Sequence, residues 1–400
     1  MKKTLELLGI KDVPRDVFIT IFTIIFNSFV WLFIILNIIS KIEENQSLLV
    51  SPNLIFYLAI ILSSLFGICV ARIIKRHLFM KIWILFGFLS SIWPIYVHLN
   101  EVTYLLFIFL LGFSFGMGLP TCLAFFSDYI AICSRGKVAG IIFFSANLGS
   151  IPFAFLFLLF PDFLTYLIIS ALWRMSALPV LMFLRLEDAY EKKKSLLNIL
   201  SSLVQRKFLT YLIPWVLFIF IDRICRPFFG TTLLEIVIGS FSSLLGGFLI
   251  DYKGRRHIVI YSFVILGIAY GIVGIAPEMQ LARITYSLLD GFAAGMLWVA
   301  FILVLWGDLS TPHTREEAYF LGNFFFFASN IVSILTITLI ESLPINAVFP
   351  LASFFLFLAV IPLLYAPETL PEKLIRRREL RKYVEKAKKI REKYEKRREN

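Results

Sequence analysis

The stretch Gly247-Phe-Leu-Ile-Asp251-Tyr-Lys-Gly254-Arg255-Arg256-His257 indicates the fold of this chain, because a weaker copy of it occurs upstream. The copy reads Gly67-Ile-Cys-Val-Ala71-Arg-Ile-Ile-Lys75-Arg76-His77. It keeps the first glycine, the basic pair and the histidine, but it replaces the acid by alanine. The copies begin at residues 67 and 247, an offset of nearly half of the 400-residue chain. Such a repeat indicates an internal duplication.

A second pair of loops repeats at the same offset. Asp128 precedes Arg135 by seven residues, and Asp308 precedes Arg315 by seven residues, each time between two apolar segments. We therefore expect two halves of one design in one polypeptide.

The composition is that of a membrane protein. Hydrophobic residues make up 59% of the chain and charged residues 16%, with 43 phenylalanines, which is more apolar surface than a water-soluble protein can bury. Apolar runs of about 17–26 residues are long enough to cross a hydrocarbon core of roughly 30 Å as helices. We predict an all-α membrane protein with twelve transmembrane helices, at about residues 18–39, 53–71, 81–98, 103–127, 137–160, 162–185, 208–227, 232–250, 257–275, 281–306, 317–340 and 346–365.

The distribution of Lys and Arg predicts the orientation. Loops after even-numbered helices carry most of the basic residues, whereas the opposite side offers little beyond Lys41, Arg226 and Arg283. By the positive-inside rule, both termini lie in the cytoplasm of a multi-pass protein of the cell membrane. The first helix lacks a small-residue cleavage site, so we expect a retained anchor.

We predict four segments. They are a six-helix bundle over 1–186, a cytoplasmic linker over 187–207, a second six-helix bundle over 208–366 and a basic cytoplasmic tail helix over 367–400. The tail holds nine of the twelve net positive charges, with 14 Lys and Arg against five Glu from Lys373 onward. Because the body is nearly neutral, we expect no nucleic-acid partner. The tail either supports orientation and solubility or binds anionic lipid headgroups.

Motifs of other function classes are missing. The four cysteines and four histidines show no metal-binding spacing, and the sequence contains no nucleotide-binding loop or hydrolase elbow. We therefore expect no metal, no cofactor and no enzymatic activity.

Two six-helix repeats with a Gly-x-x-x-Asp-x-x-Gly-Arg-Arg loop resemble the major facilitator superfamily of secondary transporters, from residue 15 to about residue 370. The two acid-to-arginine loops and Pro367-Glu368-Thr369 are similar to those of sugar porters and the related organic-ion transporters. The seventh helix departs from the sugar porters, because it lacks their Gln-rich stretch. The resemblance implies a cytoplasmic gate formed by Gly247, Asp251, Gly254, Arg255, Arg256, Asp128, Arg135, Asp308, Arg315 and Glu368.

Loop charges suggest how such a gate is held. Asp251 can face the positive N-terminal end of the fifth helix, near Arg135. Because Ala71 lacks the matching acid, we expect a lopsided lock, strongest where the loop after the eighth helix meets the first half. The alternative is that the basic residues only enforce topology.

An ionisable residue within the hydrocarbon costs roughly 2.5–3.5 kcal/mol on insertion scales and usually has a function. Asp290 is the first candidate, on one stripe of the tenth helix with Trp298, while Gly291 and Gly295 permit close approach of a neighbouring helix. The resemblance implies that helices 1, 4, 7 and 10 line the cavity, so Asp290 would face substrate or carry a proton. The alternative is a carboxylate satisfied by a neighbouring Arg or Tyr for packing alone.

Further candidates leave alternatives open. Asp222 and Arg226 are four residues apart and predict a local ion pair; alternatively, Arg226 attracts an anionic substrate or pairs with Asp290. Arg174, midway along the sixth helix, either reaches the bundle interior or marks a misplaced helix boundary. Asn27 contributes either to the site or to a contact between helices.

We predict a secondary active transporter that moves a small polar or organic solute by alternating access, in symport with protons through Asp290. The alternative is a non-transporting sensor or chaperone on a major facilitator scaffold; a polytopic membrane enzyme is a third reading. The expected partners are membrane lipid and a small-molecule substrate, and the expected state is a monomer.

Overall fold

The computed structural model describes residues 13–45, 50–97, 100–183 and 205–371, together with residues 380, 384, 387 and 388. Within these residues, twelve helices are long and apolar enough to cross a membrane, as the hydrophobic runs predict. The predicted linker core and most of the predicted tail lie outside the described residues. Of the predicted tail helix, residues 367–371 are described and are not helical, whereas Leu380, Val384, Ala387 and Lys388 are helical and exposed.

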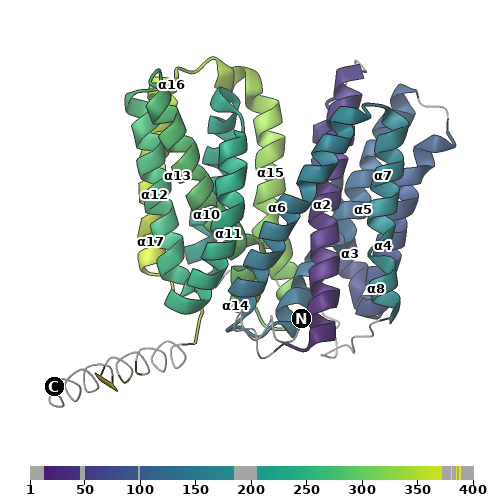
Figure 1. Ribbon diagram of the computed structural model, residues 1–400, viewed down its shortest axis with the longest axis horizontal. Coiled ribbons are helices and arrows are strands. Elements are labelled where there is room, and N and C mark those ends of the chain that lie inside the picture. The colour runs from purple at the N-terminus through teal and green to yellow at the C-terminus, as the bar shows by residue number, and fades with distance from the viewer. Residues whose placement is uncertain are drawn as a thin grey trace, which may run out of the picture.

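The spans form two bundles that stand side by side (Figure 1). The first bundle consists of α2 (Arg15–Asn45), α3 (Pro52–Ile73), α4 (Arg76–Ile92) with η1 (Trp93–Ile95), α5 (Glu101–Tyr129), α6 (Arg135–Leu159), α7 (Phe163–Met175) and α8 (Leu178–Phe183). The second consists of α10 (Arg206–Phe229), α11 (Leu233–Lys253), α12 (Arg255–Ile275), α13 (Gln280–Trp298), the π-helical segment η2 (Val299–Val304), α14 (Leu305–Leu309), α15 (Arg315–Glu341), α16 (Ile345–Leu358) and α17 (Val360–Leu364).

Helix boundaries differ most from the prediction in the first span, which was expected at 18–39 and runs over Arg15–Asn45, and in the third span. The third span was expected at 81–98 and runs over 76–95. Arg76 lies in the first turn of the helix, where it forms ion pairs with Asp128 and Glu316. These ion pairs stabilise the charge of Arg76 within the helix, so the helix begins earlier than the apolar run.

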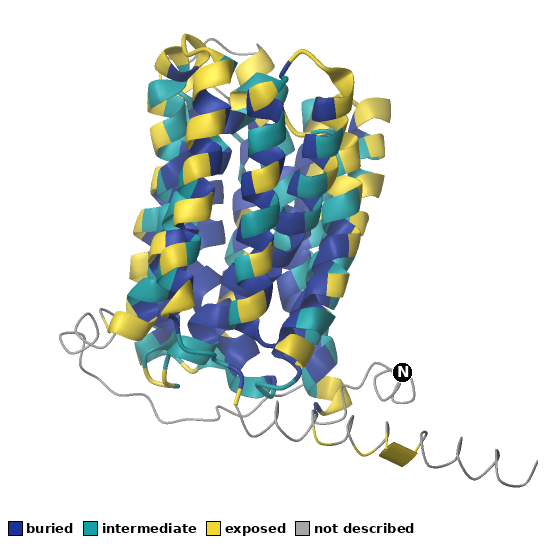
Figure 2. Cartoon of the chain, turned by 90° about the vertical axis from the view of Figure 1, so that its left-hand side faces the viewer, coloured by how far each residue is buried: buried dark blue, intermediate teal, exposed yellow. Residues whose placement is uncertain are grey.

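The outer surface of the bundles is apolar. Exposed residues run along the outward faces of the helices, whereas buried residues fill the inside (Figure 2). Large side chains on these faces include Leu62, Leu158 and Leu335, which are 58%, 78% and 66% exposed. Exposed apolar surface of this extent is stable only against lipid.

The halves meet through two equivalent helix pairs. α6 packs on α11, and α15 packs on α3; these pairs correspond to each other by the offset of the sequence repeat. Glycines set the first contact, since a Cβ added to Gly140 would lie 2.7 Å from the carbonyl oxygen of Ser243. A Cβ on Gly247 would overlap the carbonyl oxygen of Gly136 and lie 2.9 Å from the Cα of Gly140. The first glycine of the sequence signature is therefore needed for close approach of the two halves.

Both ends of the described chain lie at one end of the molecule. The start of α2 and the end of α17 lie toward the lower end in Figure 1, where α14 also lies. Arg72 in the last turn of α3 and the first residues of α6, α12 and α15, which are Arg135, Arg255 and Arg315, lie there too, because ion pairs join them to Glu317, Asp308 and Asp128. We call this the basic end.

Candidate functional site

Two cavities lie between the bundles. The first has a volume of about 320 Å³ and is lined from α6 on one side and from α10, α11, α13 and α15 on the other. The second, of about 450 Å³, is lined from α3, α10 and α15. Arg223 and Arg226 of α10 line both. These volumes are in the range of sites for small molecules, roughly 300–1,000 Å³.

The cavities lie toward the end opposite the basic end. Their walls include Asn53 at the start of α3, Glu341 at the end of α15 and Thr231 in the turn between α10 and α11. Glu341 is exposed, so the second cavity extends to the surface at this end.

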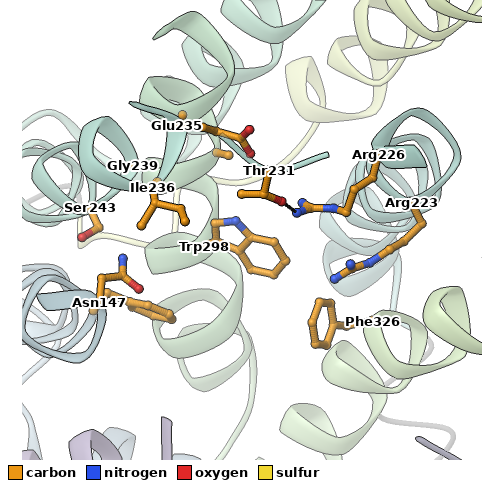
Figure 3. A pocket seen from close by; sticks show the side chains of 14 residues that line it. Asn147, Arg223, Arg226, Thr231, Glu235, Ile236, Gly239, Ser243, Trp298 and Phe326 are labelled. Carbon is orange, nitrogen blue, oxygen red and sulfur yellow. Dashed lines mark hydrogen bonds between the residues drawn. The ribbon is translucent and has the colours of Figure 1, made fainter. Parts of the chain in front are cut away.

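Arg226 has its own counter-ion. Its Nη2 donates to both carboxylate oxygens of Asp222 at 2.9 Å, and its Nη1 donates to Thr231, as the dashed line in Figure 3 shows. The predicted local ion pair is confirmed, and Asp222 rather than Asp290 is the partner. The Asp222 partner is buried, with 7% of its surface exposed.

Asp290 lies behind the cavity wall that its neighbours Gly291 and Ala294 form. It is 2% exposed, and its Oδ1 has no hydrogen-bond partner among the described residues. Glu235 of α11 lines the cavity itself, and its carboxyl group interacts electrostatically with that of Asp290. Two ionised carboxylates buried together repel each other, so a proton on one of the two groups stabilises the pair.

Sequence reasoning missed Glu235. The spacing Thr232-x-x-Glu235 is that of a capping box, and the structure shows one, with Glu235 N donating to Thr232 Oγ1 at 3.1 Å. A capping glutamate ordinarily sits at a helix end facing solvent, so the spacing hides a second role. The sequence signal for its position was Gly291, a glycine that permits close helix approach. In the structure, a Cβ on Gly291 would lie 2.6 Å from the carbonyl oxygen of Glu235.

An aromatic wall faces the two arginines. Trp298 lines the cavity, and its ring meets the ring of Phe326 edge-on at 5.3 Å and the ring of Trp215 at 5.5 Å. Asn147 of α6 adds a polar group from the first bundle (Figure 3).

Arg174 and Asn27 lie inside the first bundle and line neither cavity. The Arg174 guanidinium lies between the rings of Trp31 and Trp83, at 4.5 and 4.2 Å from their centroids. Its Nη1 donates to Asn27 Oδ1 at 3.1 Å and to Ser28 Oγ at 2.9 Å. Of the two alternatives for Arg174, the structure shows the bundle interior, where it joins α7 to α2.

Asp251 lies where the loop charges placed it. It is fully buried, and its two carboxylate oxygens accept hydrogen bonds from the backbone N–H groups of Gly136 at 3.0 Å and Lys137 at 2.9 Å. These groups belong to the first turn of α6, whose positive dipole end favours a carboxylate. The contact joins the second bundle to the first.

The repeated acid and arginine loops exchange partners between the bundles. Arg135 of the first bundle pairs with Asp308 of the second at 2.5 Å. Arg315 of the second bundle donates to Asp128 of the first. Arg255 adds an ion pair with Asp308 at 2.6 Å.

Charge contacts join the halves on the side of Ala71 too, and the expectation that the side of Asp251 is the stronger one stays a prediction. Glu316 and Glu317, in the first turn of α15, form ion pairs with Arg76 and Arg72 of the first bundle, the former at 3.1 Å. By the repeat offset, these glutamates stand where the first half has Gly136 and Lys137. The acid missing at Ala71 is thus offset by acids on the other side of the interface.

Glu368, Gly254 and Arg256 act within the second bundle. Glu368 accepts hydrogen bonds from the backbone N–H groups of Arg255 at 2.9 Å and Arg256 at 3.1 Å and so caps α12. Gly254 between α11 and α12 has φ of 107°, which only glycine adopts without strain. Arg256 Nη1 donates to the carbonyl of Ala366 at 3.2 Å.

No protein-family model and no curated protein sequence matches the chain. Solved structures do match it. A human organic anion transporter, MFSD10 (TETRAN), is 13% identical with a TM-score of 0.69, covering 87% of this chain and 99% of that one. A variant of the E. coli fucose:proton symporter FucP is 11% identical with a TM-score of 0.70, over 88% and 98% of the chains. A structure of FucP in the outward conformation is 12% identical with a TM-score of 0.72, over 88% and 100%.

At these identities the matches show the fold alone. The chain has the major facilitator fold of these structures, and its twelve candidate membrane spans make it a multi-pass membrane protein.

Proposed function

We propose that this protein is a secondary active transporter that moves a small polar or organic solute by alternating access. The observation that carries this proposal is the pairing of two cavities at one end of the bundle interface with a set of ion pairs between the bundles at the basic end. A site between two bundles that is closed on one side only is what alternating access requires. Rocking of the bundles would break these ion pairs and close the cavities.

The basic end is the cytoplasmic end in this proposal, by the positive-inside rule. The structure then represents the outward-facing state, with both termini on the cytoplasmic side of the cell membrane. The solved FucP structure in the outward conformation, which has a similar fold, supports this assignment.

Proton coupling is assigned to Asp290 together with Glu235. A proton on one of the two carboxyl groups would relieve the repulsion between them, and Glu235 reaches the cavity from which protons and solute would arrive. A carboxyl group within the membrane that is shielded from water can exchange its proton only when the cavity admits one. Symport follows if solute binding and protonation both precede closure.

Transport is tested with the full-length protein in proteoliposomes. A radiolabelled panel of metabolites of both charge signs and of no charge is offered in counterflow, and active solutes are then tested for accumulation driven by a pH gradient. Asp290→Asn is expected to lower accumulation by more than about tenfold. Counterflow should persist, because exchange needs no net proton movement. No counterflow with this panel is expected both for a transporter of another solute class and for a non-transporting sensor. The two differ in what a bound solute does: in a sensor the basic end stays closed when solute binds, whereas in a transporter it opens.

A further inference from the structure

Arg223 is the cation of the cavity wall that lacks a carboxylate of its own. The nearest acid is Asp222, whose Oδ2 lies 3.9 Å from Arg223 Nε. Both oxygens of that carboxylate already accept hydrogen bonds from Arg226 at 2.9 Å. Arg223 Nε is buried and has no hydrogen-bond partner within the described part of the chain. The Arg223 side chain as a whole is 20% exposed, so its guanidinium is only partly desolvated, and an anion that joins it would complete its pairing.

The position of Arg223 makes it available to a ligand. It lines both cavities, so it lies where they adjoin. In Figure 3 its side chain extends from α10 toward the space between Trp298 and Phe326. Its guanidinium lies 5.3 Å from the centroid of Phe326, a contact that orients the planar group without neutralising it.

The other ionisable groups of the two walls do not neutralise Arg223. Arg226 is balanced by Asp222. Glu235 is engaged with Asp290, and Glu341 is exposed at the outer end of α15. When the Glu235 and Asp290 pair takes up a second proton, the positive charge of Arg223 is left over.

We propose that the cavity binds a small organic anion, whose acid group pairs with Arg223 and whose ring or chain packs against Trp298 and Phe326. The guanidinium fork suits a carboxylate or sulfonate with two oxygens, and the aromatic walls favour an apolar body. This inference rests on the proposed transport function for the claim that the bound anion is a substrate. Protonation of the Glu235 and Asp290 pair would favour anion binding, and so couple the anion to a proton.

Binding is measured first, separately from transport. The purified full-length protein is titrated with benzoate, naphthoate and benzenesulfonate and with the uncharged benzamide and naphthamide, by calorimetry and by thermal stabilisation. At least one anion is expected to bind, and its uncharged counterpart to bind about 10- to 100-fold more weakly, as for loss of a charged hydrogen bond. Arg223→Gln is expected to remove this preference and to weaken binding of the anion by the same factor.

Arg283→Gln is the matched control. Arg283 also lies over a phenylalanine ring, at 5.4 Å from Phe229, but it lines neither cavity. It is expected to leave anion affinity within about twofold. The proposal is overturned if no anion binds the wild type, if the amides bind as well as the anions, or if Arg223→Gln and Arg283→Gln behave alike.

The two proposals fail in different ways. Anion binding that depends on Arg223 without any uptake in proteoliposomes contradicts the transport function and leaves the anion site. Counterflow of a neutral or cationic solute that is unaffected by Arg223→Gln contradicts the anion site and leaves transport.

Discussion

At the scale of single residues, the contact between Glu235 and Asp290 is the feature with the most direct consequence. Asp290 is closed off from the cavity, whereas Glu235 lines it. A proton that reaches Asp290 from the cavity would therefore pass through Glu235. In the proposed symport, Glu235 would therefore take up the proton and Asp290 would retain it.

Replacing Glu235 by Gln tests this order. Gln keeps the length of the side chain but cannot take up or release a proton, so accumulation driven by a pH gradient is expected to fall by about tenfold or more. Counterflow should stay within about twofold. The measurement is uptake in proteoliposomes at several pH values, with Glu278→Gln as control, since Glu278 is an exposed partner of Arg283. Full accumulation by Glu235→Gln would rule the group out of the proton path.

At the scale of elements, the pairing of α6 with α11 depends on glycine. A Cβ on Gly140 would lie 2.7 Å from the carbonyl oxygen of Ser243 and 3.1 Å from the Cα of Gly247, and neither of these backbone atoms can move aside as a side chain can. The contact exists only while the basic end is closed, if the bundles rock as proposed. Its packing therefore bears on the balance between the two states as well as on stability.

Gly140→Ala is expected to weaken closure of the basic end, because the added methyl group costs about 1–3 kcal/mol of overpacking in that state alone. The readout is the distribution of distances between spin labels at two exposed positions, Leu78 of α4 and Arg206 of α10. The longer distance should gain population by about fivefold or more. Gly271→Ala is the control, since its Cβ would meet only the Oγ of Ser353, at 3.2 Å, inside one bundle. Equal distributions in the two variants would argue against a closing role for this helix pair.

At the scale of the whole molecule, the basic end is locked from both halves. Asp251 of the second bundle binds the start of α6. On the other side of the interface, Glu316 and Glu317 at the start of α15 bind arginines of the first bundle. The two sides of the lock use the same helix ends but opposite chemistry, a carboxylate on backbone N–H groups in one and side-chain ion pairs in the other.

Two variants measure the two sides. Asp251→Asn and the double variant Glu316→Gln with Glu317→Gln are each expected to raise the open population of the basic end by about tenfold, as loss of a partly buried charge contact would. The same spin labels report it, and Glu44→Gln, which removes an exposed ion pair with Lys41, should not change it. An effect of Asp251→Asn alone would support the lopsided lock that the loss of the acid at Ala71 suggested.

The sequence by itself determined the number of membrane helices, the duplication and the helix ends that carry charge. These properties are local: a run of apolar residues of sufficient length must be a helix in lipid, and a repeated loop keeps its place in each half. The pair Asp222 and Arg226 was also predictable, because both residues lie on one helix face.

Only the tertiary structure decided which charges meet. Asp128 and Arg315 are far apart in the chain, as are Glu317 and Arg72, and their pairing follows from the packing of α3 on α15 and of α6 on α11. The contact of Glu235 with Asp290 likewise depends on how closely Gly291 lets α13 approach α11. Sequence spacing fixes the face of a helix on which a charge lies, but the partner of that charge depends on which other helix packs there, and that is a property of the assembled bundles.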